Sequence, residues 1–147
     1  MSAPEMQLSA EWRALLEAAL AARERAHAPY SRFPVGAAVQ GASGRIYSGC
    51  NVENASSGLT VCAERVAVWK AVSEEEREIV ALAVVTESGA MPCGACRQVL
   101  SEFAQDLPIL VADTAGQARF TSLGALYPQP FSRANLVQAE GEERNAT

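Results

Sequence analysis

Three cysteines and one glutamate stand in two short groups whose spacing suits metal chemistry. Cys62-Ala63-Glu64 comes first, and Pro92-Cys93-Gly94-Ala95-Cys96 follows later in the chain. A C-x-x-C turn at a helix start lets two sulfurs converge at about 2.3 Å on one zinc ion. Because residues i and i+2 do not share a side of a helix, Cys62 and Glu64 can serve one site only beyond the helix end. We therefore expect two helix N-termini to meet at the metal, where their positive dipole ends stabilise thiolates.

Three thiolates leave one tetrahedral position of zinc open. Structural zinc sites close that position with a fourth protein ligand, whereas catalytic sites leave it to water. Glu64 is then interpreted as a general acid and base beside the metal, an arrangement typical of zinc deaminases. Three thiolates also carry more negative charge than zinc neutralises. Arg65 and Arg97, which directly follow Glu64 and Cys96, are candidates to hydrogen-bond the sulfurs and withdraw charge; otherwise they are surface arginines.

Other interpretations of the cysteines stay open at this stage. Cys93 and Cys96 alone have the spacing of a redox pair, which leaves Cys62-Ala63-Glu64 unexplained. A structural zinc knuckle with Cys50 as fourth ligand leaves Glu64 without a role. Cys50 is otherwise interpreted as a small buried hydrophobe. His27, the one histidine, is interpreted as a helix C-terminal cap rather than a ligand.

Length and composition narrow the class of protein. With 147 residues, 49% of them hydrophobic and 20% charged, the chain fits one soluble globular domain over residues 1–147, with a flexible tail from about residue 137. Residues 1–12 lack the features of a secretory signal, and no apolar run approaches the roughly 20 residues of a membrane span. We expect a cytoplasmic protein, since thiols stay reduced there and clustered cysteines bind metal.

The charge balance argues against a polynucleotide partner. The formal net charge is -5, from 12 basic and 17 acidic residues, and no cluster of lysines and arginines forms a stripe along the sequence. Tight binding to nucleic acid requires such a stripe, because neutralisation of backbone phosphates supplies most of the affinity. We therefore expect neither a nucleic acid polymer nor a membrane as partner.

Hydrophobic periodicity and turn residues predict how these groups are positioned. Helices are expected at 8–27 with Ser9 as N-cap, at 60–72 with Thr60 as a possible cap, and at 92–105. Strands are expected at 35–40 and 45–49 as an antiparallel hairpin, at 79–86, at 107–112 and at 119–121. Strand–helix–strand alternation in the second half indicates parallel pairing there. The fold class is α/β, with a mixed sheet of about five strands and helices on both faces.

Four segments make the chain similar to a known family over nearly its whole length. They are residues 30–38 (YSRFPVGAA), 49–54 (GCNVEN), 58–65 (GLTVCAER) and 92–98 (PCGACRQ). In this order and spacing they resemble the small, homotetrameric, zinc-dependent cytidine deaminases. The resemblance implies a three-layer α/β/α sandwich, with four active sites shared between the subunits of a homotetramer.

The resemblance also implies an activity and residue roles. The reaction would be hydrolysis of cytidine or deoxycytidine to uridine or deoxyuridine and ammonia, a step of pyrimidine salvage that acts on the free nucleoside and uses Zn²⁺. Cys62, Cys93 and Cys96 would bind the zinc, and Glu64 would shuttle protons. Asn51 and Glu53 would hold the ribose hydroxyls, Phe33 would pack on the pyrimidine, Ala63 would contact the substrate, and Phe131 would cover the base in a neighbouring subunit.

Two departures from the family pattern bear on specificity. Ser57 stands where relatives usually carry an aromatic residue, and Met91 stands where a serine often precedes the Pro-Cys pair. Both are expected near the mouth of the active site, so we hypothesise that groups on the cytosine amino nitrogen (N4) are tolerated. The alternatives are the same chemistry on another cytosine-containing small molecule, or a non-enzymatic, zinc-stabilised interaction module.

Overall fold

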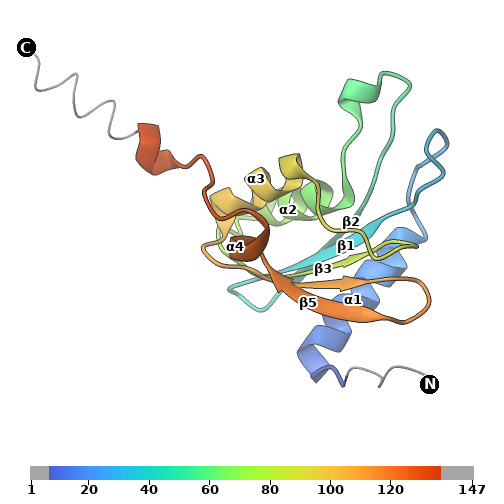
Figure 1. Ribbon diagram of the computed structural model, residues 1–147, viewed down its shortest axis with the longest axis horizontal. Coiled ribbons are helices and arrows are strands. Elements are labelled where there is room, and N and C mark those ends of the chain that lie inside the picture. Colours follow the sequence, from blue (N-terminus) through green and yellow to red (C-terminus); the bar gives the residue numbers. More distant parts are fainter. Residues whose placement is uncertain (1–6, 137–147) are drawn as a thin grey trace, which may run out of the picture.

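A computed structural model describes residues 7–136; the tail expected from about residue 137 lies outside the described residues. Within them, five strands form one mixed sheet in the order β2-β1-β3-β4-β5 (Figure 1). The strands are β1 (Gly36–Gly41), β2 (Ile46–Cys50), β3 (Ile79–Val85), β4 (Pro108–Ala112) and β5 (Ala118–Ser122). β3 and β4 pair in parallel, and the other neighbours pair antiparallel. The predicted hairpin, parallel pair and strand number are confirmed.

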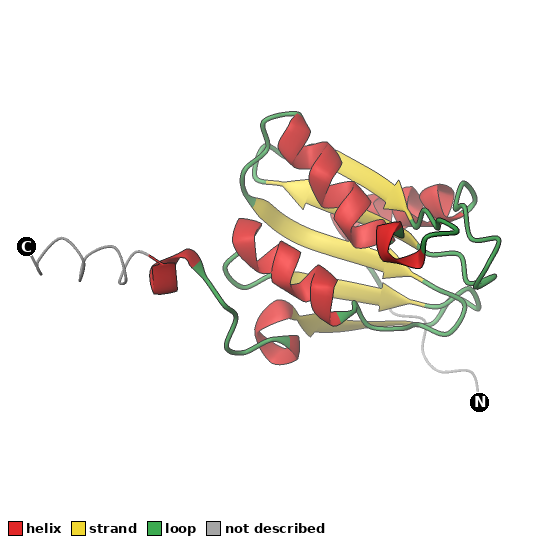
Figure 2. Ribbon diagram, turned by 90° about the horizontal axis from the view of Figure 1, so that it is seen from above, coloured by secondary structure: helices red, strands yellow, loops and turns green. Residues whose placement is uncertain are grey.

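Helices cover both faces of this sheet. Helix α1 (Ala10–Arg23) lies on one face, and α2 (Ala63–Ser73), α3 (Gly94–Phe103) and the short α4 (Leu123–Leu126) lie on the other (Figure 2). A 3₁₀ turn, η1 (Ser57–Leu59), stands in the loop before α2. The three-layer α/β/α architecture is therefore confirmed. None of the helices within residues 7–136 has both the length and the apolar character of a membrane span.

The core has two parts, one on each side of the sheet. On the α2 and α3 side the buried set includes Val39, Val68, Leu82 and Leu100. On the α1 side it includes Leu15, Ala19 and Leu110. Because β3 is packed on both faces, its sequence is almost continuously apolar rather than alternating.

Close backbone approach sets the distance of α2 from the sheet. A Cβ atom added to Gly49 on β2 would lie 2.6 Å from the Ala67 backbone nitrogen and 2.7 Å from the Ala63 carbonyl oxygen, both on α2. Only glycine allows this contact, which holds the first turns of α2 directly against the sheet.

The ends of two helices differ from the sequence expectation. Ser9 caps α1 as predicted, its hydroxyl accepting from Trp12 N–H at 3.3 Å. That helix ends at Arg23, so His27 is not its cap; the His27 backbone pairs instead with the segment around Val52. Thr60 does not cap α2 either. Val61 still pairs in extended conformation with Val52, so the helix begins only after Cys62.

Candidate metal centre and substrate cavity

Two of the three candidate ligands are helix N-caps. Cys62 precedes the first residue of α2, Cys93 precedes the first residue of α3, and both have extended backbones. Neither thiol caps its own helix by a hydrogen bond, so both sulfurs are free to point beyond the helix end. Cys96 lies in the first turn of α3 and is fully buried. The expected meeting of two helix N-termini is confirmed.

The three sulfurs fit one tetrahedral zinc ion. Cys62 Sγ lies 3.9 Å from Cys93 Sγ, which lies 3.5 Å from Cys96 Sγ, and all three lie within 4.8 Å of one another. Ligands at zinc–sulfur distances of about 2.3 Å stand roughly 3.8 Å apart in a tetrahedron. Cys50 is outside this group, and its thiol donates to the Arg25 carbonyl at 3.5 Å. A knuckle completed by Cys50 does not form, and a redox pair leaves the third sulfur unexplained.

Positive charge and shared protons favour a thiolate in this cluster. A hydrogen bond from Cys96, with a further contribution from Arg65, lowers the pKa of Cys62 to about 5. In return, the bond to Cys62 raises the pKa of Cys96. Arg65 Nη2 donates to Cys62 Sγ at 3.3 Å, as expected from its place beside Glu64 in the sequence.

Arg97 does not contact the sulfurs. Its Nε donates to the Pro92 carbonyl at 2.8 Å and its Nη1 donates to the Leu126 carbonyl at 2.9 Å. The rigid fork of the guanidinium thus joins the residue before Cys93 to the end of α4. The sequence expectation for Arg97 is wrong because these two backbone acceptors lie within reach of its side chain.

Glu64 lies in the first turn of α2 and is only 4% exposed. Burial raises the pKa of Glu64 above its ordinary value. A carboxyl group whose pKa is raised can both accept and return a proton near neutral pH. Its side chain lines the same cavity as Cys62 and Cys93.

This cavity has a volume of about 270 Å³, just below the roughly 300–1,000 Å³ typical of small-molecule sites. Six of the predicted site residues line it: Phe33, Asn51, Glu53, Cys62, Glu64 and Cys93. Met91 also lines it, as expected from its place before Pro92, whereas Ser57 lies on the exposed turn η1 and is not among the lining residues. The structure therefore brings together segments that are far apart in the sequence.

The two polar residues expected to meet a sugar have different surroundings. Asn51 is buried, and its side chain accepts from Val35 N–H and donates to the Phe33 carbonyl, both at 2.9 Å. Glu53 accepts from the Tyr30 and Ser31 N–H groups and from the Ser31 hydroxyl. Of these bonds, the one from the Ser31 hydroxyl does most to lower the pKa of Glu53.

Several lining residues were not predicted from the sequence to belong to the site: Ser31, Val35, Thr60, Thr86 and Ala90. Thr86 could have been predicted as a site residue from the sequence. It directly follows the buried strand β3, and ligands of α/β sheets bind at the carboxyl ends of strands. Its hydroxyl accepts from Ala90 N–H at 2.7 Å and so shapes the loop before Met91.

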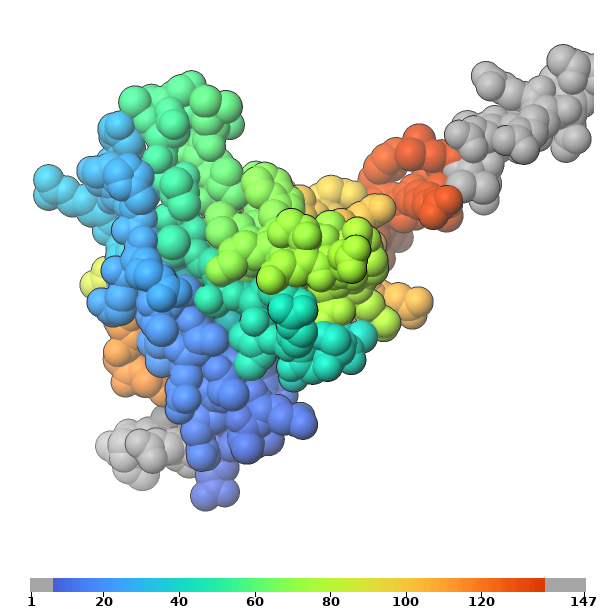
Figure 3. All heavy atoms as spheres, turned by 180° about the vertical axis from the view of Figure 1, so that it is seen from behind, coloured from blue at the N-terminus to red at the C-terminus, as the bar shows by residue number. Residues whose placement is uncertain are grey.

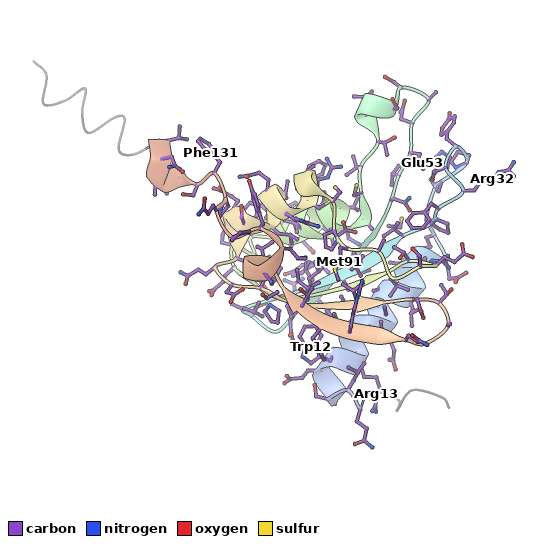
Figure 4. All side chains as sticks on the ribbon, in the orientation of Figure 1. Trp12, Arg13, Arg32, Glu53, Met91 and Phe131 are labelled. Carbon is purple, nitrogen blue, oxygen red and sulfur yellow. The ribbon has the colours of Figure 1, made fainter. Side chains whose placement is uncertain are left out.

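Two predicted substrate contacts do not line the cavity of the same chain. Ala63 is fully buried and packs in the core. Phe131 is 59% exposed and stands on the far side of the molecule from Glu53, with Met91 between them (Figure 4). Seen from behind, the segment after α4 leaves the body of the protein (Figure 3).

The fold and the cysteine group together define a zinc-binding deaminase region. Residues 10–111 match the family model described as the cytidine and deoxycytidylate deaminase zinc-binding region. The chain belongs to the cytidine deaminase family.

Relatives and solved structures agree with this membership. The chain is 48% identical over 121 residues to a cytidine deaminase of Sporosarcina psychrophila, covering 80% of this chain and 89% of that protein. Its fold is similar to the crystal structure of cytidine deaminase from Burkholderia pseudomallei, with a TM-score of 0.79. The two sequences are 46% identical, and the match covers 84% of this chain and 100% of that one. For the Mycobacterium leprae structure the identity is 40% and the TM-score 0.71, over 82% and 100% of the two chains.

Proposed function

We propose that this protein is a zinc-dependent enzyme that hydrolyses cytidine and deoxycytidine to uridine, deoxyuridine and ammonia. One observation carries the proposal: a buried glutamate lines a cavity of nucleoside scale together with two of three converging cysteines. The family membership supports the same reaction, since relatives named cytidine deaminase are matched over most of their length.

Cys62, Cys93 and Cys96 would hold the zinc ion, which supplies Lewis-acid activation of a water molecule at near-neutral pH. Glu64 accepts a proton from the water that attacks C4 of the pyrimidine and delivers it to ring N3. Glu64 then accepts the remaining proton from the new C4 hydroxyl and passes it to the amino group, which leaves as ammonia while the C4 carbonyl forms. Burial of Glu64 suits both directions of transfer, because it keeps the proton affinity of the carboxylate high.

The lining of the cavity favours a free nucleoside over a nucleotide. Two carboxylates, Glu53 and Glu64, line it, and none of its lining residues within the described chain is Lys, Arg or His. A phosphate group would meet negative charge without a cation to pair with. Asn51 and Glu53 offer donor and acceptor groups to sugar hydroxyls, and Phe33 offers an aromatic face to the base. A free nucleoside as substrate accords with pyrimidine salvage in the cytoplasm, where the thiols stay reduced.

A homotetramer with shared sites accounts for residues that one chain leaves without partners. Phe131 is exposed and does not line the cavity of its own chain, which supports a role at the cavity of another copy. A second apolar groove, lined by Val52, Val61 and Val66, runs beside Trp69, which is 49% exposed. Exposed apolar surface of this kind is typical of protein–protein contacts.

Tolerance of substituents on N4 is part of the same proposal. Met91 lines the cavity beside Cys93, and its flexible, unbranched side chain adapts to added groups. A compact acyl group on N4 should therefore enter.

Ultraviolet absorbance tests these statements together. Zinc-loaded protein is incubated with cytidine, deoxycytidine and N4-acetylcytidine, and loss of the cytosine absorbance is followed with time. We expect turnover of all three by the wild type, and rates lower by about 10²–10⁴-fold with Glu64→Gln. Turnover of the first two substrates but not of N4-acetylcytidine would refute only the tolerance of substituents on N4. If zinc is retained and nothing reacts, the site chemistry must serve another cytosine-containing molecule, or the protein is a zinc-stabilised interaction module.

A further inference from the structure

Side chains that line the cavity hold the loop of Phe33 by hydrogen bonds. The Phe33 N–H donates to the Ser31 hydroxyl oxygen at 3.1 Å, and the Phe33 carbonyl accepts from Asn51 Nδ2 at 2.9 Å. Ser31, Phe33 and Asn51 all line the cavity. Both hydrogen-bonding groups of the Phe33 backbone are therefore held by side chains that themselves face the space for a substrate.

Ser31 also holds the carboxylate of Glu53. Its hydroxyl donates to Glu53 Oε2, while Glu53 Oε1 accepts from the N–H groups of Tyr30 at 2.9 Å and Ser31 at 3.1 Å. A serine hydroxyl has one proton to donate and lone pairs to accept with. The proton serves Glu53 and a lone pair serves Phe33, so one side chain bridges a carboxylate and the backbone of an aromatic residue.

The backbone between these bonds is in an unfavourable conformation. Arg32 has a φ of 56°, in the left-handed region that residues with a Cβ atom rarely adopt. Such a conformation persists where surrounding contacts impose it. The bonds made by Ser31 and Phe33 lie on either side of Arg32 and provide those contacts (Figure 4 shows Arg32 beside Glu53).

We infer that Ser31 is a positioning residue that couples the recognition of a sugar hydroxyl at Glu53 to the placement of Phe33 against the base. The inference rests on the proposed function, which assigns the sugar to Glu53 and the base to Phe33. When a nucleoside hydroxyl binds Glu53, the carboxylate is held in place, and Ser31 transmits that position to the peptide of Phe33. Removing the Ser31 hydroxyl separates the two contacts while leaving both side chains present.

The test combines a change in the protein with a change in the substrate. Wild-type enzyme is expected to lose about tenfold or more in kcat/KM on 3′-deoxycytidine relative to cytidine, the size of one hydrogen bond to a charged group. In Ser31→Ala the KM for cytidine should rise, and the penalty for the missing hydroxyl should shrink several-fold. Ser31→Thr, which keeps a hydroxyl, should restore the wild-type penalty. Ser31→Cys, which keeps the size but donates weakly, serves as a second variant should the alanine form fold poorly.

The chain contains a matched control. Ser43, on the turn between β1 and β2, donates its hydroxyl to Glu76 and accepts from the N–H two residues on, at Arg45. It repeats the Ser31 pattern away from the cavity, so Ser43→Ala should leave both kinetic constants and the substrate penalty unchanged.

The outcomes separate this inference from the proposed function. If Ser31→Ala loses as much kcat/KM on 3′-deoxycytidine as the wild type does, the coupling role of Ser31 is refuted and the proposed function stands. Equal rates of the wild type on cytidine and 3′-deoxycytidine refute the sugar role of Glu53 and the bridge with it. Absence of any cytidine turnover refutes the proposed function itself.

Discussion

Glu64 and Arg65 are neighbours in sequence with opposite tasks at the metal centre. The Glu64 carboxyl is buried, and that burial raises its pKa, whereas Arg65 directs its charge at Cys62 and helps to lower the pKa of that thiol. Consecutive residues of a helix point about 100° apart around its axis, so one segment supplies both a proton carrier and a positive charge for the sulfurs. Activity should therefore depend on the Glu64 carboxylate itself rather than on its hydrogen bonding alone.

Glu64→Gln tests this at the residue scale. The amide keeps the size of the side chain but cannot carry a proton between water and substrate. We expect kcat to fall by about 10²–10⁴-fold, the usual contribution of general acid–base catalysis, with zinc content and unfolding temperature retained. Initial rates and metal analysis measure both. Glu102→Gln, an exposed change on α3, is the control; near-normal turnover by Glu64→Gln would remove Glu64 from its role.

At the scale of elements, the metal site depends on how α2 and α3 are held. The helices lie side by side on one face of the sheet, with Cys62 and Cys93 at their N-termini. Arg97 links the start of α3 to α4 by hydrogen bonds. Gln98 links α3 to the segment after α4, because its side chain donates to the Phe131 carbonyl at 2.9 Å. Zinc would be a further link between α2 and α3.

Removal of the metal should loosen these elements. Zinc binding to three thiolates contributes directly to the free energy of folding, because the unfolded chain holds no preformed site. We expect a chelator to lower the unfolding temperature of the wild type, and Cys93→Ala to lose both metal occupancy and stability. Calorimetry with and without chelator measures the effect. Cys50→Ala, outside the cluster, should respond to the chelator like the wild type; an equal unfolding temperature with and without zinc would contradict the link.

Arg97→Ala should weaken the same region without touching a sulfur. Two carbonyl groups, at Pro92 and Leu126, lose their donor, which costs about 1–3 kcal/mol of stability. We expect a lower unfolding temperature and faster loss of zinc to a chelator, with Arg97→Lys intermediate because an ammonium cannot form the fork. Denaturant titration and the rate of zinc release decide the matter. Unchanged values in Arg97→Ala would show that α3 is positioned by core packing alone.

At the scale of the whole molecule, one chain forms the cavity but does not close it. Phe131 points away from its own site, and the groove beside Trp69 leaves apolar surface exposed. Both features support the proposal that other copies of the same chain complete each site.

Mixed oligomers test that completion. Phe131→Ala should raise KM, because the base loses an aromatic contact, and Glu64→Gln should be nearly inactive. If Phe131 acts across subunits, co-expressed mixtures contain sites with an intact Glu64 and a neighbour's Phe131, so their KM should return toward the wild-type value. Kinetics of doubly tagged, purified oligomers measure this. A KM equal to that of Phe131→Ala alone would place Phe131 outside the shared site, and a monomer in light scattering would exclude sharing.

The sequence by itself determined the elements and most of the chemical groups. Periodicity located α1, β3 and α3 to within a few residues, because helix and strand repeats are local. The spacing of Cys62, Cys93 and Cys96 predicted a common metal site at two helix ends, since ligand distances and helix geometry leave few alternatives. The motif segments also named six of the residues that line the cavity.

Only the tertiary structure decided which groups meet and what each one holds. Arg97 turns to two carbonyls rather than to sulfur, because backbone acceptors from α4 and the loop before α3 lie within its reach. Helix α2 begins after Cys62 rather than at Thr60, because pairing with Val52 keeps Val61 extended. Ser31 joins Glu53 to Phe33 only because the loop folds over the cavity. Such contacts depend on segments brought together by the sheet, and no local pattern in the sequence specifies them.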